Sequence, residues 1–189
     1  MSRELNKMKL HIVRHGETNY NVLRLCSESL GTHVFLTKKG KEQAQSVAEQ
    51  LAHVHFDAVY VSELYRTIQT ASIINHYHEL PLKIDSRIDE RVTGFDNLPL
   101  ELYYQYYESD WYNKKAVGAE SFQELKARVR LFLQDIFKKR DEYENVLIVS
   151  HGQVIHAMKT FLNGMSDEEV YELDKAGHPN NGEVFTYEL

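Results

Sequence analysis

The chain has 189 residues, a formal net charge of −6, and 42% hydrophobic and 26% charged residues. This length and composition predict a globular protein with one domain, spanning 1–189. The net negative charge gives no support to a nucleic-acid partner, and no apolar stretch is long enough to cross a membrane. The N-terminal residues lack the apolar core of a secretion signal, and the single cysteine, Cys26, excludes an internal disulfide. We therefore expect a cytoplasmic protein.

Strands and helices are predicted to alternate along the chain. This alternation favours an α/β fold, and we expect a three-layer α/β/α sandwich with a mostly parallel central sheet and helices on both faces. In chain order the predicted elements are a strand at Lys9–Arg14, a helix from Thr37 to Leu51, a strand at Ala58–Ser62, a helix at Leu64–Tyr77, a strand at Leu82–Asp85, a helix from Ser121 to about Asp141, a strand at Val146–Ser150, a helix at Gln153–Leu162 and a strand at Glu183–Glu188.

The segment at about 91–118 departs from this alternation. Its stretch 98–112 is dense in tyrosine and contains Trp111. We expect an aromatic-rich lid or insertion. It could be an amphipathic helical excursion whose rings pack on the domain, a cover over a binding site for the organic part of a substrate, or both. The same aromatic cluster could instead form a homodimer contact.

Two predicted strands end in a histidine followed by a glycine. His15 and Gly16 follow the first apolar run, and His151 and Gly152 follow the strand at Val146–Ser150. In open α/β sheets the ligand crevice lies at the carboxyl ends of the strands. We therefore expect the two imidazoles to meet in one site that handles phosphate.

The residue types around these histidines suit phosphoryl transfer. His15 is the candidate nucleophile, because an ordinary imidazole is largely neutral at pH 7. Arg14 and Arg66 are the candidate phosphate cations, since a planar guanidinium holds two oxygens at once. His151 is expected to be protonated when phosphate is bound, and the Gly152 amide opens a helix whose dipole favours an anion.

The proton donor and the outer phosphate contacts are less sharply indicated. Asp85, Asp89 and Glu90 are all candidates for the acid, and their spacing does not choose among them. Thr18 and Asn21 could contact the phosphate or the substrate, although both residue types also serve turns and helix caps.

The sequence lacks two common nucleotide-binding motifs. It has neither a phosphate-cradling P-loop nor a dinucleotide fingerprint. The pairs His53/His55 and His76/His78 have spacing that suits two metal ligands, but no matching acidic or cysteine cluster accompanies them. The residues therefore indicate neither nucleotide-cradle chemistry of these kinds nor a metal site.

Several separated motifs resemble those of the histidine phosphatase superfamily, in its phosphoglycerate-mutase-like branch and of the broad-specificity phosphatase type. The resemblance spans nearly the whole chain. The matching residues are Arg14-His15-Gly16-Glu17-Thr18 with Asn21, the segment 36–44, the Arg-Thr-x-Gln-Thr-Ala pattern at 66–71, Ile88-Asp89-Glu90, Gly118-Ala119-Glu120-Ser121 with Arg128, Ser150-His151-Gly152, and Asn181.

The resemblance implies a transient phosphohistidine on His15 and assigns Glu90 as the acid and base. It places Arg14, Arg66 and His151 around the phosphate and requires no metal or organic cofactor. The chain departs from the family pattern at Glu63, in the loop 24–35, and at Asp96-Asn97. These departures concern substrate-facing loops and therefore the specificity.

The expected function is hydrolysis of phosphate monoesters, with a small phosphorylated molecule as substrate. A cofactor-dependent phosphoglycerate mutase is the first alternative. It would need additional basic groups for a second phosphate, and Lys114 and Lys115 could supply them from the lid. A phospho-ligand binding protein without turnover is the second alternative.

Overall fold

The computed structural model describes residues 7–189. Its sheet has the strand order β3-β2-β4-β1-β5. Strands β1, β2, β3 and β4 run parallel, and β5 pairs antiparallel with β1 at one edge. The strands are β1 Lys9–Arg14, β2 Ala58–Val61, β3 Leu82–Ile84, β4 Asn145–Ser150 and β5 Val184–Glu188.

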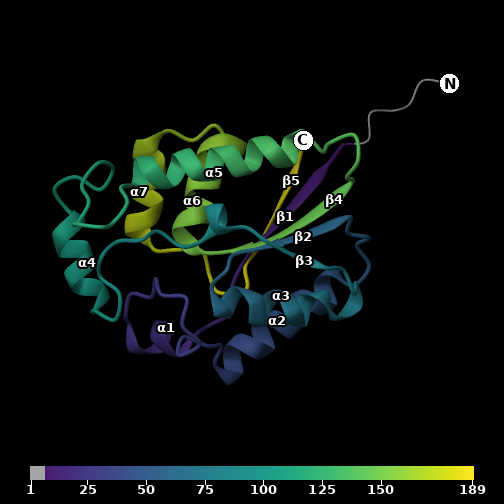
Figure 1. The fold of residues 1–189 in the computed structure, drawn as a ribbon, viewed down its shortest axis with the longest axis horizontal. Coiled ribbons are helices and arrows are strands. Elements are labelled where there is room, and N and C mark those ends of the chain that lie inside the picture. Colours follow the sequence, from purple (N-terminus) through teal and green to yellow (C-terminus); the bar gives the residue numbers. More distant parts are fainter. Residues whose placement is uncertain (1–6) are drawn as a thin grey trace.

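Helices cover both faces of this sheet, so the expected three-layer sandwich with a mostly parallel sheet is confirmed (Figure 1). Helices α2 and α3 pack together on one face, whereas α5, α6 and α7 cover the other. Helices α1 and α4 lie beyond one end of the sheet. The helices are α1 Asn19–Leu23, α2 Lys38–Leu51, α3 Tyr65–Ile74, α4 Leu100–Tyr107, α5 Phe122–Phe137, α6 Gly152–Leu162 and α7 Asp167–Ala176.

Two helices end earlier than the sequence predicts, each for a local reason. Helix α3 stops at Ile74, because the Asn75 side chain both donates to the Leu80 carbonyl and accepts from its amide, which turns the chain. Helix α5 stops at Phe137, where its buried apolar stripe ends and a run of charged residues begins.

Helices α1 and α7 are absent from the sequence prediction. Helix α7 buries only Val170 and Asp174, so it carries almost no apolar stripe. Its start is nevertheless marked by a capping box between Ser166 and Glu169, which is a readable signal. Helix α1 has five residues and none of them is buried.

The aromatic-rich segment 91–118 packs into the core through part of its length. Tyr103 and Tyr107 of α4 and Trp111 are buried. The Trp111 ring stacks on Phe122 of α5, with the ring centroids 4.0 Å apart. Arg91 holds the base of the segment, since its guanidinium donates to main-chain carbonyls and lies 4.5 Å from the centre of the Tyr107 ring.

Neighbouring strands bring the two His-Gly pairs together. Strands β1 and β4 pair so that Arg14 lies opposite Ser150, and the His15 amide donates to the Ser150 carbonyl at 3.0 Å. His15 and His151, which directly follow these two residues, therefore lie at the same edge of the sheet. Burial of both strands on both faces explains their continuous apolar runs.

Gly16 allows close packing between the loop after β1 and the start of α2. A Cβ atom at Gly16 would lie 2.3 Å from the Gly40 carbonyl oxygen. A Cβ at Gly40 would lie 2.0 Å from the Glu17 carbonyl oxygen. The first turn of α2 can thus pass directly against the loop after β1 only because both residues are glycine. The Gly16 amide donates to Thr70 Oγ1.

Candidate active site

His15 is buried at the carboxyl end of β1, with 3% of its surface exposed. Its Nδ1 lies 2.8 Å from the Gly16 carbonyl oxygen, and Arg66 Nε donates to its Nε2 at 3.2 Å. Because the guanidinium can only donate, Nε2 carries the lone pair and Nδ1 carries the proton. Burial and the charges of Arg66 and Arg14 hold the pKa of His15 well below its usual range. The imidazole is therefore neutral, with its lone pair on Nε2.

Arg14 and Arg66 place two positive charges near His15, and both lower its pKa. Arg66 comes from the first turn of α3, is 2% exposed, and also donates to the Ser27 carbonyl at 3.0 Å. Burial lowers the pKa of Arg66 to about 10, so it stays protonated at neutral pH. Arg14 donates to the Pro179 carbonyl. Burial lowers the pKa of both guanidinium groups, and the negative charge of Glu90 opposes this effect.

His151 lies directly before α6 and has no exposed surface. Its ring packs edge-on against His15, with the ring centroids 5.2 Å apart. Its Nε2 is 2.7 Å from Ser62 Oγ. Burial and the charge of Arg66 hold the pKa of His151 well below the usual value. Gly152 opens α6 as predicted, and its lack of a side chain admits the His178 ring, which would lie 2.7 Å from a Cβ there.

The structure separates the three acidic candidates. Asp85 forms an ion pair with Arg87 at 2.7 Å, and Asp89 accepts a hydrogen bond from Ser62 Oγ. Only Glu90 lines the cavity that also holds His15.

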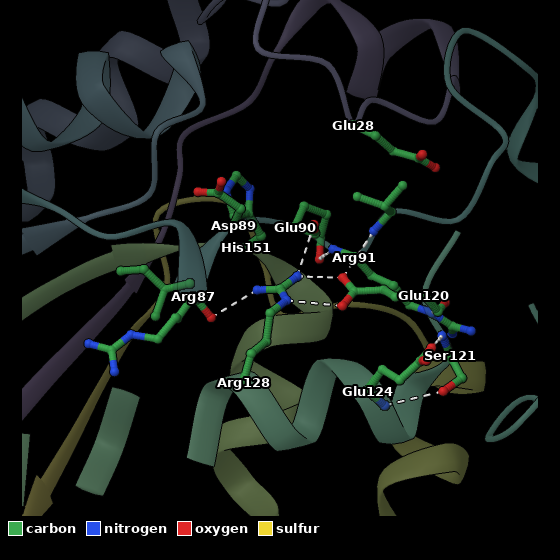
Figure 2. A network of polar contacts seen from close by, with 12 residues as sticks. Glu28, Arg87, Asp89, Glu90, Arg91, Glu120, Ser121, Glu124, Arg128 and His151 are labelled. Atoms are coloured by element: carbon green, nitrogen blue, oxygen red, sulfur yellow. Dashed lines mark hydrogen bonds and ion pairs between the residues drawn. The ribbon is translucent and has the colours of Figure 1, made fainter. Parts of the chain in front are cut away.

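The segment that carries Glu90 is clamped by Arg128 of α5 (Figure 2). The Arg128 guanidinium donates to both carboxylate oxygens of Glu120, to the Arg87 carbonyl at 2.8 Å and to the Glu90 carbonyl at 3.2 Å. The Glu90 carboxylate accepts from the Arg91 amide. One side chain thus ties the main chain on both sides of Asp89 to α5.

A cavity of about 100 Å³ opens at this end of the sheet. Its wall contains five of the predicted site residues, and sequence reasoning did not single out Tyr103, Gln153 and His178, which also line it. Gln153 directly follows Gly152, so its place beside the second histidine motif was a signal that could have found it. The predicted residues in the wall are Arg14, His15, Asn21, Arg66 and Glu90.

Several polar atoms around the cavity have no hydrogen-bond partner within residues 7–189. They are the buried atoms Arg14 Nε and Gln153 Oε1, whose residues line the cavity, and Nδ1 of His151, which is not part of the cavity wall but packs against His15. Buried polar groups in native proteins are almost always paired. We therefore expect a polar ligand to pair with the unpaired atoms of the cavity wall.

Two predicted phosphate contacts have mainly local partners. Thr18 is fully buried and forms a capping box with Asn21 at the start of α1, so it lies outside the cavity wall. Asn21 reaches the cavity, and its amide oxygen also accepts from Asn181 at 3.3 Å. Asn181 in turn donates to the His15 carbonyl at 3.0 Å.

The two lysines considered for a second phosphate have other partners. Lys114 Nζ donates to the Tyr106 carbonyl and to Ser109 Oγ. Lys115 Nζ forms an ion pair with Glu124 at 2.5 Å. Neither lysine lines the cavity of His15.

No group of three or more histidine, cysteine or acidic side chains in the described part of the chain is arranged to hold a metal ion. His78, from one of the two pairs considered as metal ligands, packs edge-on against Phe56. Within residues 7–189, no helix has the length and apolar character needed to cross a membrane.

Known proteins resemble this chain over nearly its whole length. It is 33% identical over 172 residues to the adenosylcobalamin/alpha-ribazole phosphatase of Escherichia coli K12, covering 87% of this chain and 83% of that protein. It is 30% identical over 166 residues to phosphoserine phosphatase 1 of Hydrogenobacter thermophilus, covering 84% and 77%. The solved alpha-ribazole phosphatase of Shigella flexneri superposes with a TM-score of 0.83 at 29% identity, covering 95% and 89%.

A family model settles which group these similarities belong to. The model described as histidine phosphatase superfamily (branch 1) matches residues 10–184, a span that includes both His-Gly pairs, Arg66 and Glu90. This chain therefore belongs to the histidine phosphatase superfamily, branch 1.

Proposed function

We propose that this protein hydrolyses phosphate monoesters through a phosphohistidine formed on His15. One observation carries the proposal: the neutral, buried imidazole of His15 lines the cavity, and its unprotonated Nε2 lies within hydrogen-bond distance of the Arg66 guanidinium. A nucleophile needs that lone pair, and a phosphate needs those cations. Membership of the superfamily supports the same chemistry.

The first step transfers the phosphoryl group to the protein. His15 Nε2 attacks phosphorus and forms the N–P bond, while the bond from phosphorus to the ester oxygen breaks. Glu90, in its protonated form, gives its proton to the leaving oxygen, so that an alcohol departs. Nδ1 donates its proton to the Gly16 carbonyl, and this hydrogen bond stabilises the positive charge that develops on the ring.

The second step returns the enzyme to its starting state. The Glu90 carboxylate takes a proton from water, the water oxygen attacks phosphorus, and the N–P bond breaks. Inorganic phosphate leaves, and His15 is neutral again. In both steps Arg14 and Arg66 hold the phosphoryl oxygens, and His151 contributes a further donor once a phosphate dianion has favoured its protonated form.

The size of the cavity and the names of related proteins favour a small monophosphate as substrate. Relatives of this chain are named for adenosylcobalamin/alpha-ribazole and for phosphoserine. Because the cavity measures only about 100 Å³, we propose a small phosphorylated molecule for this chain. We propose that the segment 91–118 acts as a lid, because Tyr103 of α4 lines the cavity. Hydrolysis is favoured over a mutase reaction because Lys114 and Lys115 are engaged elsewhere. A homodimer contact and a cytoplasmic location stay predictions of the sequence.

A screen of phosphate esters with free phosphate as the readout tests the proposal. The panel should hold alkyl, sugar, nucleotide and amino-acid monophosphates and a phosphorylated three-carbon acid. We expect phosphate release that is lost in His15→Ala and kept in the matched control His76→Ala, whose side chain is exposed. An isomerised ester in place of free phosphate would identify a mutase. Tight phosphate binding without turnover on any ester would identify a binding protein.

A further inference from the structure

Ser62 lies fully buried between a carboxylate and an imidazole. It follows β2, and its Oγ is 2.7 Å from Asp89 Oδ1 and 2.7 Å from His151 Nε2. Asp89 is half-buried and also accepts from the Glu63 amide at 2.8 Å. In Figure 2, Asp89 and His151 lie close together to the left of Glu90, and Arg91 lies to its right. The three groups form a continuous chain, Asp89–Ser62–His151.

The protons available on Asp89, Ser62 and His151 determine which group donates in each of these hydrogen bonds. An ionised carboxylate can only accept, so the single hydroxyl proton of Ser62 is donated to Asp89. The Ser62 oxygen also accepts from the Leu64 amide at 3.2 Å. With its proton committed, Ser62 can only accept from His151, and the His151 proton must therefore be on Nε2.

This assignment leaves the lone pair of a neutral His151 on Nδ1, which has no partner within the described residues. A lone pair repels a phosphate oxygen, so His151 becomes a phosphate donor only when Nδ1 is also protonated. The ring is then an imidazolium that donates through both nitrogens, one toward the ligand and the other toward Ser62.

The charged surroundings of His151 oppose that protonation. Burial is the main cause that lowers the pKa of His151, and the charges of Arg66 from α3, Arg14 from β1 and Arg128 from α5 lower it further. His15 packs on one side of the ring. Among the acidic groups, Asp89 is joined to His151 through Ser62, whereas Glu28 and Glu90 line the cavity together with His178.

We propose that Ser62 and Asp89 are positioning residues for His151: they hold its proton on Nε2, and the charge of Asp89, relayed by Ser62, stabilises the doubly protonated ring when a phosphate dianion binds. The proposal deepens the proposed function and rests on it. The additional proton comes from solvent. Burial raises the pKa of Asp89, but the hydrogen bonds from Ser62 and the Glu63 amide favour its charged form.

Asp89→Asn tests the charge with little change of shape. The amide oxygen of an asparagine can still accept from Ser62 and from the Glu63 amide, so only the charge is removed. Asp85→Asn is the matched control, because Asp85 lies in the same segment but pairs with Arg87. The measurement is the pH dependence of kcat/KM for p-nitrophenyl phosphate between pH 5 and 9 for both variants and the wild type.

We expect the alkaline limb of the Asp89→Asn profile to move to lower pH. At the acidic end its kcat/KM approaches that of the wild type, and at the alkaline end the deficit grows to about tenfold for each unit by which the pKa of His151 falls. Asp85→Asn should follow the wild-type profile. An equal loss at every pH would show a merely structural role, and a profile identical to that of the wild type would show no role. Either result overturns the proposal.

A spectroscopic measurement separates failure of this inference from failure of the proposed function. Protein labelled with ¹⁵N-histidine reports the protonation of each ring nitrogen, and the signals of His151 are those missing from His151→Gln. With inorganic phosphate as the probe, we expect the wild type to hold a proton on Nε2 alone before addition and on both nitrogens after it. Asp89→Asn should reach the doubly protonated state only at lower pH, and Ser62→Ala should show a mixture of neutral tautomers. A wild-type His151 with its proton on Nδ1 would refute the inference, whether or not any ester is hydrolysed.

Discussion

Replacement of Arg66 by lysine separates the charge of this side chain from its geometry. Lysine keeps a positive charge but has no planar fork. In the structure the Arg66 guanidinium donates to His15 Nε2 at 3.2 Å and to the Ser27 carbonyl at 3.0 Å, which holds it beside the nitrogen that we propose as the nucleophile. A lysine at this position can reach one of these places but not both.

The size of the effect follows from the hydrogen bonds that are lost. One hydrogen bond to a charged group contributes about 1.5–3 kcal/mol. Since 1.36 kcal/mol corresponds to a tenfold change in rate, Arg66→Lys should lower kcat/KM by about 10- to 150-fold. Arg66→Met should lower it further, because it also removes a phosphate cation. It should also raise the pKa of His15, since the charge of Arg66 helps to hold that pKa down.

The assay is kcat/KM against pH for Arg66→Lys, Arg66→Met and the control Arg130→Lys, whose side chain is exposed. Attack requires neutral His15, so the acid limb reports its pKa. This limb should move to higher pH in Arg66→Met and stay in place in Arg66→Lys. The reasoning would be refuted if Arg66→Lys stayed within threefold of the wild type, or if both Arg66 variants shifted the acid limb equally.

Three further predictions concern the acid, its clamp and the buried imidazoles. Glu90→Gln should lower kcat for alkyl phosphates by about 10²–10⁴-fold, with a smaller loss in the first step for p-nitrophenyl phosphate, whose leaving group needs no proton; equal losses on both substrates in single-turnover experiments would contradict this role. Arg128→Met should lower kcat by up to about 10²-fold by releasing the main chain at Glu90, and it should leave Glu120 without its partner; an unchanged kcat would show that the clamp does not position Glu90. Because burial lowers the pKa values of His15 and His151 in the folded state, the unfolded chain binds more protons below its histidine pKa of about 6.5. The free energy of unfolding should therefore fall with decreasing pH below that value, by up to about 1.4 kcal/mol per pH unit for each histidine. Urea unfolding at pH 7.5 and 5.0 measures this loss, and a double variant with glutamine at both positions that lost as much would contradict it.

The sequence predicted the sheet and the place of the two histidines because both depend on strong local patterns. Strands β1 and β4 are buried on both faces, so their apolar runs stand out. Each strand ends at its histidine motif, and the rule for parallel sheets places both motifs at the same edge. Arg66 could be placed because it follows a strand and opens a helix.

The contacts that refine the site depend on packing, which the sequence does not display. Ser62 meets Asp89 across 27 residues of chain and His151 across 89, and no spacing rule joins them. The family resemblance pointed to Glu90, but residue spacing alone left Asp85, Asp89 and Glu90 open, because it does not show which carboxylate already has a partner. The directions of the Lys114 and Lys115 side chains depend on the path of the chain after α4 ends at Tyr107, and the sequence pattern does not display that path.

Trapping the covalent intermediate tests the central claim most directly. The protein is mixed with a radiolabelled monoester that it hydrolyses, quenched within milliseconds, digested and analysed by mass spectrometry. The account predicts a phosphoryl group on His15 that is stable in base and labile in acid, and its absence in His15→Ala. Turnover that persists in His15→Ala, or a label on any other residue, would contradict it.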